Sequence, residues 1–191
     1  VKELENYLVT SVGKIVSLCG RYYTMDRDKR WERVKQGYDL MVNGIGKPYK
    51  NVLNAIADSY NEEVTDEFIK PVIITDQEGR PIATIQPNDV VICFNFRTDR
   101  LREITIALTQ KDMPEHGMKT IPLYYVTMAR YDETFKNVNV IFDKEDVKDS
   151  LGEIISLEGK KQLRIAETEK YPHVTFSFPV VEKEFFKVKK G

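Results

Sequence analysis

Two arginines that follow an apolar run are the most informative feature of this sequence. Arg97 and Arg100 come directly after residues 89–96, a run of β-branched and aromatic side chains that predicts a buried strand. Ligands of α/β sheets gather at the carboxyl ends of strands, and a guanidinium there can hold phosphate or carboxylate through two parallel hydrogen bonds. The sequence therefore predicts an anion site after this strand. The alternative is that the arginines only form surface ion pairs with Asp99 or Glu103.

A second pair of arginines follows another strand-like run, residues 14–19. Arg21 comes just after that run, and Arg27 falls in the first turn of a predicted helix. A cation is unfavourable beside the positive end of a helix dipole, so an anionic ligand held by the first backbone amides would explain it. Alternatively, Asp26 and Asp28 cap this helix and merely pair with Arg27. If the two strands run parallel, all four guanidinium groups meet at one edge of the sheet.

A third polar stretch follows the predicted strand 162–167. Lys170 could act as a point charge on a transferred phosphoryl group. His173 could be a ligand or a base, or a structural residue at the start of the next strand. The chain shows neither a glycine-rich phosphate loop nor the cysteine and histidine spacing of a zinc site, so no catalytic metal is expected within it.

These residues need strands and helices that position them, and the two kinds of segment alternate along the chain. This predicts an α/β fold, with a layered, mostly parallel sheet flanked by helices and a C-terminal β-hairpin. The expected helices are residues 1–11, 26–41, one starting at Pro48, one through 101–108 capped by Thr98 or Asp99, and 150–158. The expected strands are residues 14–19, 68–74, 82–85, 89–96, 121–128, 138–142, 162–167 and 174–178.

Composition limits the class of protein further. The 191 residues suggest one domain or two small ones, and no apolar run is long enough to span a bilayer. A net charge of -1 argues against a general nucleic-acid or membrane-surface binder. Cys19 and Cys93 lack metal-type spacing and suggest reduced, buried thiols in a cytoplasmic protein. The chain opens at Val1 inside a helical pattern, as expected of a piece of a longer protein.

Three stretches resemble signature motifs of the cofactor-independent (2,3-bisphosphoglycerate-independent) phosphoglycerate mutases. They occur in that family's order and at its approximate spacing, and they are Gly20–Val34, Phe94–Arg100 and Leu163–Phe176. The resemblance covers roughly residues 1–178. It implies that residues 1–178 are part of a phosphotransferase, or substrate-binding, domain and that residues 179–191 are a divergent tail, a final strand or a linker.

The resemblance implies an isomerase of glycolysis that interconverts 3-phosphoglycerate and 2-phosphoglycerate. In that family a phosphatase-like domain carries two divalent metal ions, usually manganese, and a serine that becomes phosphorylated, while an inserted α/β domain binds the phosphoglycerate. The implied substrate-binding residues are Arg21, Arg27, Arg97, Thr98, Asp99, Arg100 and Lys170. Of these, Lys170 is also the implied catalytic residue, near the phosphorylated serine.

The chain departs from the family's pattern in several places. The phosphatase-like domain is absent, and so are a histidine-containing stretch and an arginine-aspartate pair that also bind substrate in the family. The tail lacks the family's pair of glycines. We therefore expect no cofactor in this chain, no turnover by it alone, and the phosphatase-like domain as its partner, with no nucleic acid and no membrane. The alternatives are a stand-alone anion-binding module and a scaffold whose arginines only form ion pairs.

Overall fold

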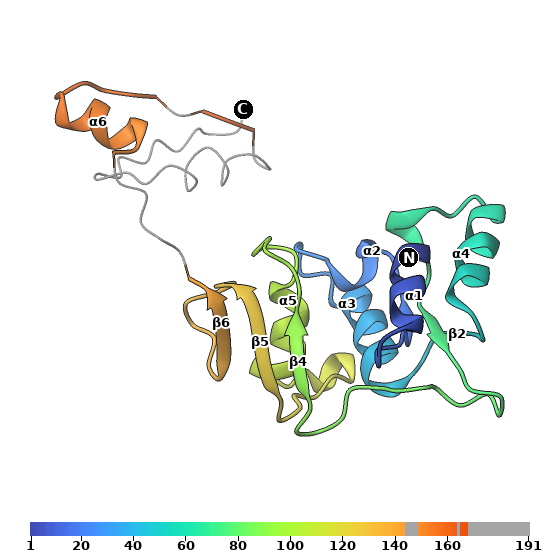
Figure 1. The fold of residues 1–191 in the computed structure, drawn as a ribbon. Helices are drawn as coiled ribbons and strands as arrows, with labels where there is room; N and C mark the ends of the chain where they lie inside the picture. Colours follow the sequence, from blue (N-terminus) through green and yellow to red (C-terminus); the bar gives the residue numbers. More distant parts are fainter. Residues whose placement is uncertain (144–148, 164, 168–191) are drawn as a thin grey trace. The chain divides into compact units, whose positions relative to one another are not determined.

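A computed structural model describes residues 1–143, 149–163 and 165–167 of the chain (Figure 1). The chain divides into two compact units, residues 1–143 and 144–191. The first unit contains two three-stranded sheets and most of the helices, so the predicted α/β class is confirmed. The predicted boundary at residues 178–179 lies outside the described residues. None of the helices in the described part is long and apolar enough to cross a membrane.

The helices and strands follow one another through most of the described chain. The helices are α1 (Lys2–Val9), α2 (Arg21–Thr24), α3 (Trp31–Tyr38), α4 (Val52–Asn61), α5 (Arg102–Thr105) and α6 (Leu151–Leu157). Two π-helical segments, Asp39–Asn43 and Ile106–Gln110, extend α3 and α5, and two 3₁₀ turns cover Asp66–Phe68 and Pro114–His116. The strands are β1 (Ser17–Leu18), β2 (Lys47–Tyr49), β3 (Val72–Ile74), β4 (Val90–Cys93), β5 (Tyr124–Ala129) and β6 (Val138–Phe142).

The first sheet has the strand order β1-β3-β2 and packs against α4. β2 runs parallel to β3, whereas β1 runs antiparallel to it. The prediction of a helix starting at Pro48 is wrong, because Pro48 lies in β2. The helix begins at Val52 instead, since the Asn51 side chain accepts hydrogen bonds from the backbone N–H groups of Leu53 and Asn54 and caps it.

The second sheet has the strand order β4-β5-β6, and all three strands are parallel. One face is covered by α3, α5 and the π-helical segment that follows α5, and it forms the main hydrophobic core of the first unit. Tyr125 is fully buried in this core. Its hydroxyl lies 2.8 Å from Cys93 Sγ and 3.1 Å from Thr105 Oγ1, so a polar network ties β4, β5 and α5 together.

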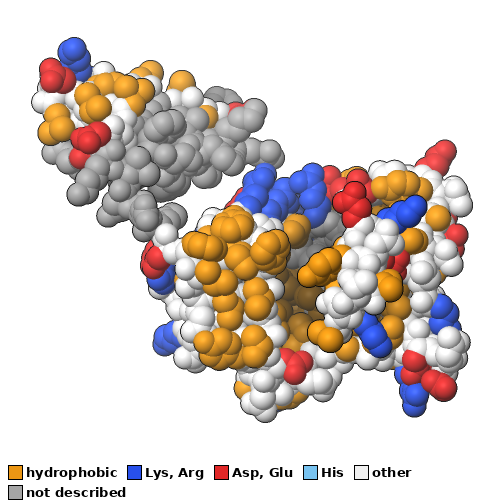
Figure 2. Space-filling model, viewed as in Figure 1, with side chains coloured by type: hydrophobic (Ala, Val, Ile, Leu, Met, Phe, Trp, Pro, Cys, Tyr) orange, Lys and Arg blue, Asp and Glu red, His pale blue; other side chains and the backbone are white. Residues whose placement is uncertain are grey.

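The opposite face of the second sheet is exposed. Its side chains are 56–83% exposed and are Val90, Ile92, Phe94, Phe96, Tyr124 and Phe142. Figure 2 shows the apolar surface that they contribute to over these strands. Within the predicted strand 89–96, only Val90–Cys93 forms a strand, and the prediction that it is buried is wrong for this face. Parallel sheets are normally covered on both faces, and among the described residues only one face is covered.

The predicted helix 26–41 is also corrected by the structure. Its N-terminal part is a loop, residues 25–30, between α2 and α3. Lys29 has a φ of 59°, the left-handed region that non-glycine residues rarely adopt, and this interrupts a helix. Arg27 consequently lies in a loop and not in a first helical turn.

Close packing of α2 on α3 fixes both ends of this loop. A Cβ added to Gly37 in α3 would lie 2.2 Å from Thr24 Cγ2 in α2, so only glycine permits this approach. The loop between the two helices is therefore anchored on either side by a tight helix contact.

The second unit contains the predicted helix 150–158, observed as α6. Ser150 caps it, since its Oγ accepts a hydrogen bond from the backbone N–H of Glu153 at 3.3 Å. Within 162–167, the described residues are not in a strand, contrary to the sequence prediction. The predicted strand 174–178, and with it the C-terminal hairpin, lies outside the described residues.

Candidate anion-binding site

Two arginines bind one carboxylate just beyond the carboxyl end of β4, and a third lies in the same loop. Asp99 lies in the loop 94–101 and accepts hydrogen bonds from Arg97 at 2.6 and 3.0 Å and from Arg27 at 3.0 Å. Arg100 donates from Nη1 to the carbonyl oxygen of Met25 at 3.0 Å, so it joins the same two loops. We call Arg27, Arg97, Arg100 and Asp99 the arginine cluster. Figure 2 shows basic side chains gathered on the edge of the first unit where α2 and the loop after β4 lie in Figure 1.

The loop 94–101 is held in shape by its own side chains and by β5. Asn95 Oδ1 accepts a hydrogen bond from the backbone N–H of Arg97 at 2.7 Å. The hydroxyl of Tyr131, just after β5, donates to the carbonyl oxygen of Asn95 at 2.6 Å. The expectation that Thr98 or Asp99 caps the next helix is wrong: the residue before α5 is Leu101 and makes no side-chain cap. The Asp99 carboxylate is occupied by guanidinium groups instead.

The cluster carries more positive than negative charge and is partly open to solvent. The cluster holds three guanidinium groups and one carboxylate: Arg27 and Arg97 pair with Asp99, whereas Arg100 bonds to the carbonyl oxygen of Met25. The Arg97 side chain is 50% exposed. Nε of Arg100 is buried and has no hydrogen-bond partner among the described residues. A buried donor without an acceptor is costly, and an anion could supply the acceptor. The arrangement can therefore bind a small phosphate or carboxylate.

The charges in the cluster shift the pKa of Asp99. Its hydrogen bonds with Arg97 hold the pKa of the carboxyl well below its usual range, and although partial burial acts in the opposite direction, the guanidinium of Arg27 lowers it further. The pKa of Arg97 is raised, chiefly by the hydrogen bond to Asp99. Asp99 is therefore ionised at neutral pH, and its negative charge offsets part of the repulsion between the two guanidinium groups that it binds.

Asp99 should make the first unit sensitive to acid. Because its pKa is lower in the folded than in the unfolded chain, its contribution to stability is complete above the unfolded value of about 4 and is lost as the pH falls below it. Asp99→Asn should therefore reduce the free energy of unfolding near neutral pH, by about 1 kcal/mol for this partly exposed pair. The difference from the unsubstituted chain should shrink as the pH is lowered in urea-unfolding experiments. A difference that stayed constant down to about pH 3 would contradict this assignment.

Arg21 is not part of the cluster. Its guanidinium donates to Glu67 at 2.7 Å, and its side chain is 51% exposed. The expectation that the strands before Arg21 and Arg97 share one parallel sheet is wrong: β1 lies in the first sheet and β4 in the second. Arg21 is nevertheless the first residue of α2, one helical turn from the loop that carries Arg27.

The remaining predicted site residues have different outcomes. Thr98 is half-buried within the loop 94–101, between two members of the cluster. Lys170 and His173 lie outside the described residues. Glu103, the suggested ion-pair partner, is turned toward the loop 25–30, where it accepts a hydrogen bond from the backbone N–H of Lys29 at 2.8 Å.

Sequence reasoning missed two further arginines at the same edge of the sheet. Arg130 follows β5 and pairs with Asp143 and Glu133. Arg102 donates from Nε and Nη2 to the carbonyl oxygen of Tyr131, at 3.0 and 2.9 Å. Arg130 could have been found from its position directly after the predicted strand 121–128. Its two acidic partners make it a weaker candidate for an anion than the cluster.

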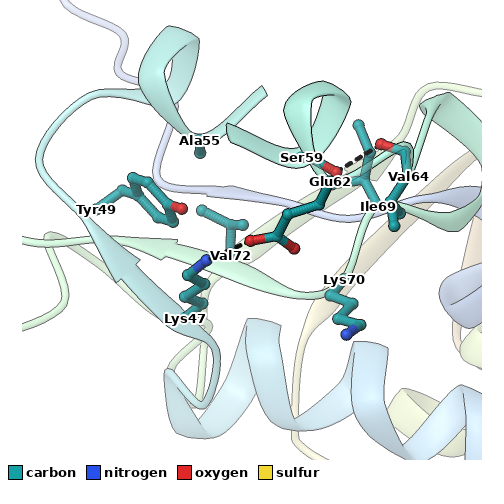
Figure 3. Close-up of a pocket in the computed structure, with 9 residues that line it drawn as sticks. All are labelled: Lys47, Tyr49, Ala55, Ser59, Glu62, Val64, Ile69, Lys70 and Val72. Atoms are coloured by element: carbon teal, nitrogen blue, oxygen red, sulfur yellow. Dashed lines mark hydrogen bonds and ion pairs between the residues drawn. The ribbon is translucent and has the colours of Figure 1, made fainter. Parts of the chain in front are cut away.

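Two hollows elsewhere in the first unit are poorer candidates. One, between α4 and the first sheet, has a volume of about 30 Å³, roughly that of one water molecule (Figure 3). Its Lys47 already pairs with Glu62 at 3.3 Å. The other, about 610 Å³, is lined by neutral residues near the amino ends of the strands, including Asn88, Thr109 and Asn137. Neither combines room with positive charge.

The described residues contain no group of three or more His, Cys, Asp or Glu side chains that could hold a metal ion. Cys19 and Cys93 are both free, and burial raises the pKa of each thiol. Neither thiol is therefore suited to act as a nucleophile.

Comparison with known proteins places the chain among a set of related sequences. A family model described as "BPG-independent PGAM N-terminus" matches residues 1–133. The "2,3-bisphosphoglycerate-independent phosphoglycerate mutase" of Flavobacterium psychrophilum is 57% identical over 178 residues, which are 93% of this chain and 35% of that protein. The protein of the same name from Parabacteroides distasonis is 58% identical over 179 residues, with the same coverage of both chains.

A solved structure agrees with the sequence comparisons. The structure of Leishmania mexicana phosphoglycerate mutase at low cobalt concentration superposes with a TM-score of 0.75 and 31% identity. It covers 92% of this chain, whereas this chain covers 34% of it. The chain thus spans about a third of the length of the relatives that it matches.

Proposed function

This chain belongs to the family of 2,3-bisphosphoglycerate-independent phosphoglycerate mutases, and from this membership we propose that its arginine cluster binds the anionic groups of phosphoglycerate. The observation that carries the proposal is the convergence of Arg27, Arg97 and Arg100 on one partly open site at the carboxyl end of β4. Arg21, Thr98 and Lys170 remain proposed members of the same site.

In the proposed reaction, 3-phosphoglycerate and 2-phosphoglycerate are interconverted through a phosphoserine on a phosphatase-like domain. The phosphoryl group passes to the serine, the glycerate reorients, and the group returns to the other hydroxyl. Two divalent metal ions, by family resemblance manganese, would act in that domain and not in this chain. We propose that residues 1–178 form the substrate-binding part, that residues 179–191 form a separate tail, and that the protein works in the cytoplasm.

The arginines suit one step of this scheme in particular. The glycerate must stay bound while its phosphoryl group is on the serine, and it must turn without leaving. Two-point contacts from guanidinium groups fix the orientation of a carboxylate as well as its charge. The same groups can offset charge on the transferred phosphoryl group when the domains close.

A second candidate function is a scaffold without ligand, favoured by one observation. Arg27 and Arg97 pair with Asp99, and Arg21 pairs with Glu67, so these three already have acidic partners within the chain. Exposed ion pairs of this kind contribute little to stability, so exchanging them for contacts with a ligand would cost little free energy. The scaffold predicts that replacing these arginines leaves turnover unchanged.

Turnover measurements distinguish the proposals. The 191-residue chain alone should not convert 3-phosphoglycerate, because the serine and the metal ligands are not expected in it. A chimera in which residues 1–178 replace the matching segment of the Flavobacterium psychrophilum relative should be active. Turnover by the chain alone would refute the proposed division of labour, as would a folded chimera without activity whose unaltered parent is active under the same conditions.

A further inference from the structure

The loop 25–30 is held in an unfavourable backbone conformation by two buried acidic side chains. Lys29 adopts a φ of 59°. A non-glycine residue in this region persists only where surrounding contacts impose it. The contacts here come from Asp26 inside the loop and from Glu103 in α5, and both residues are at least 95% buried.

Asp26 holds the loop from within. One of its oxygens, Oδ2, accepts hydrogen bonds from the backbone N–H groups of Asp28 and Arg30, both at 2.9 Å. The other, Oδ1, lies 3.5 Å from Nη1 of Arg33 in α3. Burial raises the pKa of Asp26, but the two backbone hydrogen bonds, Glu103 and Arg33 together lower it. Asp26 is therefore the ionised member of the two carboxyl groups.

Glu103 holds the loop from the opposite side. Its Oε1 accepts a hydrogen bond from the backbone N–H of Lys29 at 2.8 Å, across 74 positions of sequence. Its Oε2 is buried and has no hydrogen-bond partner among the described residues. Burial, together with the nearby charges of Asp26 and Asp28, raises the pKa of Glu103 to about 7, although the Lys29 amide acts in the opposite direction. Near neutral pH this carboxyl can therefore carry a proton, which has the ionised Asp26 as its neighbour.

We propose that Asp26 and Glu103 together act as positioning residues that hold the loop 25–30, and with it Arg27, against Asp99. The inference rests on the proposed function of the arginine cluster, because the loop is of interest only if Arg27 binds substrate. Arg27 reaches Asp99 from this loop, and Arg100 bonds to Met25 at its start. Deprotonation of Glu103 adds a second buried negative charge at this loop, where Arg33 is the cation beside Asp26 and Asp28 adds further negative charge.

The test uses the full 191-residue chain and three variants. Glu103→Ala removes the contact to Lys29 and should speed hydrogen exchange of the Lys29 and Arg30 amides. It should also weaken binding of 3-phosphoglycerate about tenfold, as measured by NMR titration. Glu103→Gln keeps an acceptor for Lys29 and a neutral donor on the same side chain. It should therefore show the slow amide exchange and the affinity for 3-phosphoglycerate of the unsubstituted chain. Glu115→Gln, at an exposed glutamate, serves as the matched control and should match the unsubstituted chain.

The pH profile separates positioning from a merely structural role. At each pH, the affinity of the unsubstituted chain is divided by that of Glu103→Gln. This ratio should fall about fivefold or more as the pH rises through 7, since only the unsubstituted chain has a carboxyl at position 103 that can lose its proton. The ratio cancels the titration of the ligand itself. A ratio that stays flat, or equal losses in Glu103→Ala and Glu103→Gln, would overturn the inference. If the unsubstituted chain binds no 3-phosphoglycerate, the proposed function fails, while the exchange rates still report on the carboxyl pair.

Discussion

Replacing Arg97 by alanine in the active chimera should lower kcat/KM for 3-phosphoglycerate by about 10- to 150-fold, the loss expected for one or two charged hydrogen bonds. Arg97 is the most direct choice because its side chain is half exposed and, within the described part of the chain, bonds only to Asp99. Arg97→Lys should recover part of the loss, since a lysine supplies the charge but not the two-point contact.

Arg80 offers a matched control for this experiment. It lies in the turn between β3 and β4, its side chain is 72% exposed, and it pairs with Asp76 and Glu78 much as Arg97 pairs with Asp99. Arg80→Ala should leave kcat/KM unchanged. Equal behaviour of the two variants would support the scaffold function and would falsify the assignment of Arg97 to substrate binding.

A second large effect is expected in the core beneath the site. Ile104 is 3% exposed in α5, where it packs in the core cluster that also includes Tyr125. Ile104→Ala should lower the free energy of unfolding by about 3 kcal/mol, because it removes buried carbon atoms and leaves a cavity. Unfolding in urea can be followed by fluorescence of Trp31, the single tryptophan, which packs against the same core.

The exposed face of the second sheet supplies the control for this variant. Ile92 in β4 is 57% exposed, so Ile92→Ala should cost about 1 kcal/mol or less. The comparison involves the same chemical change in the helix that covers one face of the second sheet and on the opposite, exposed face of that sheet. Equal losses in the two variants would mean that the apolar face formed by Val90, Ile92 and their neighbours is buried in solution.

The sequence was a reliable guide where a short segment determines its own structure. The strand at β4 follows from its β-branched and aromatic run, and the placement of Arg97 and Arg100 just beyond it follows from that strand. α6 was predicted because Ser150 and the glycine after the helix mark its ends. In each case the deciding interactions lie within a few residues of one another.

It failed where distant residues decide the conformation. The helix expected from residue 26 is interrupted by Lys29, whose left-handed backbone depends on Glu103, 74 positions away. Arg21 was expected at the same sheet edge as Arg97, but pairing of β1 with β3 places its strand in another sheet. No local pattern distinguishes the two sheets, since strands of both are short and apolar.

The candidate site shows the same division. Clustering of Arg27 with Arg97 was expected from the sequence, although for a reason that proved wrong, because Arg27 lies in a loop and not at a helix start. An ion pair of Arg97 with Asp99 was weighed as the alternative to an anion site, but Arg27 was not foreseen as a second donor to the same carboxylate, for which a helix-capping role was also considered. Its side chain was free for the guanidinium groups because α5 begins later, at Arg102.

The most direct test of the account is an NMR titration of the 191-residue chain with 3-phosphoglycerate, following backbone amides and arginine Nε–H groups. The account predicts that the largest shifts fall in residues 25–30 and 95–100 and that they are lost in Arg97→Ala. Shifts centred on the hollow beside Lys47, or shifts that persist unchanged in Arg97→Ala, would contradict it.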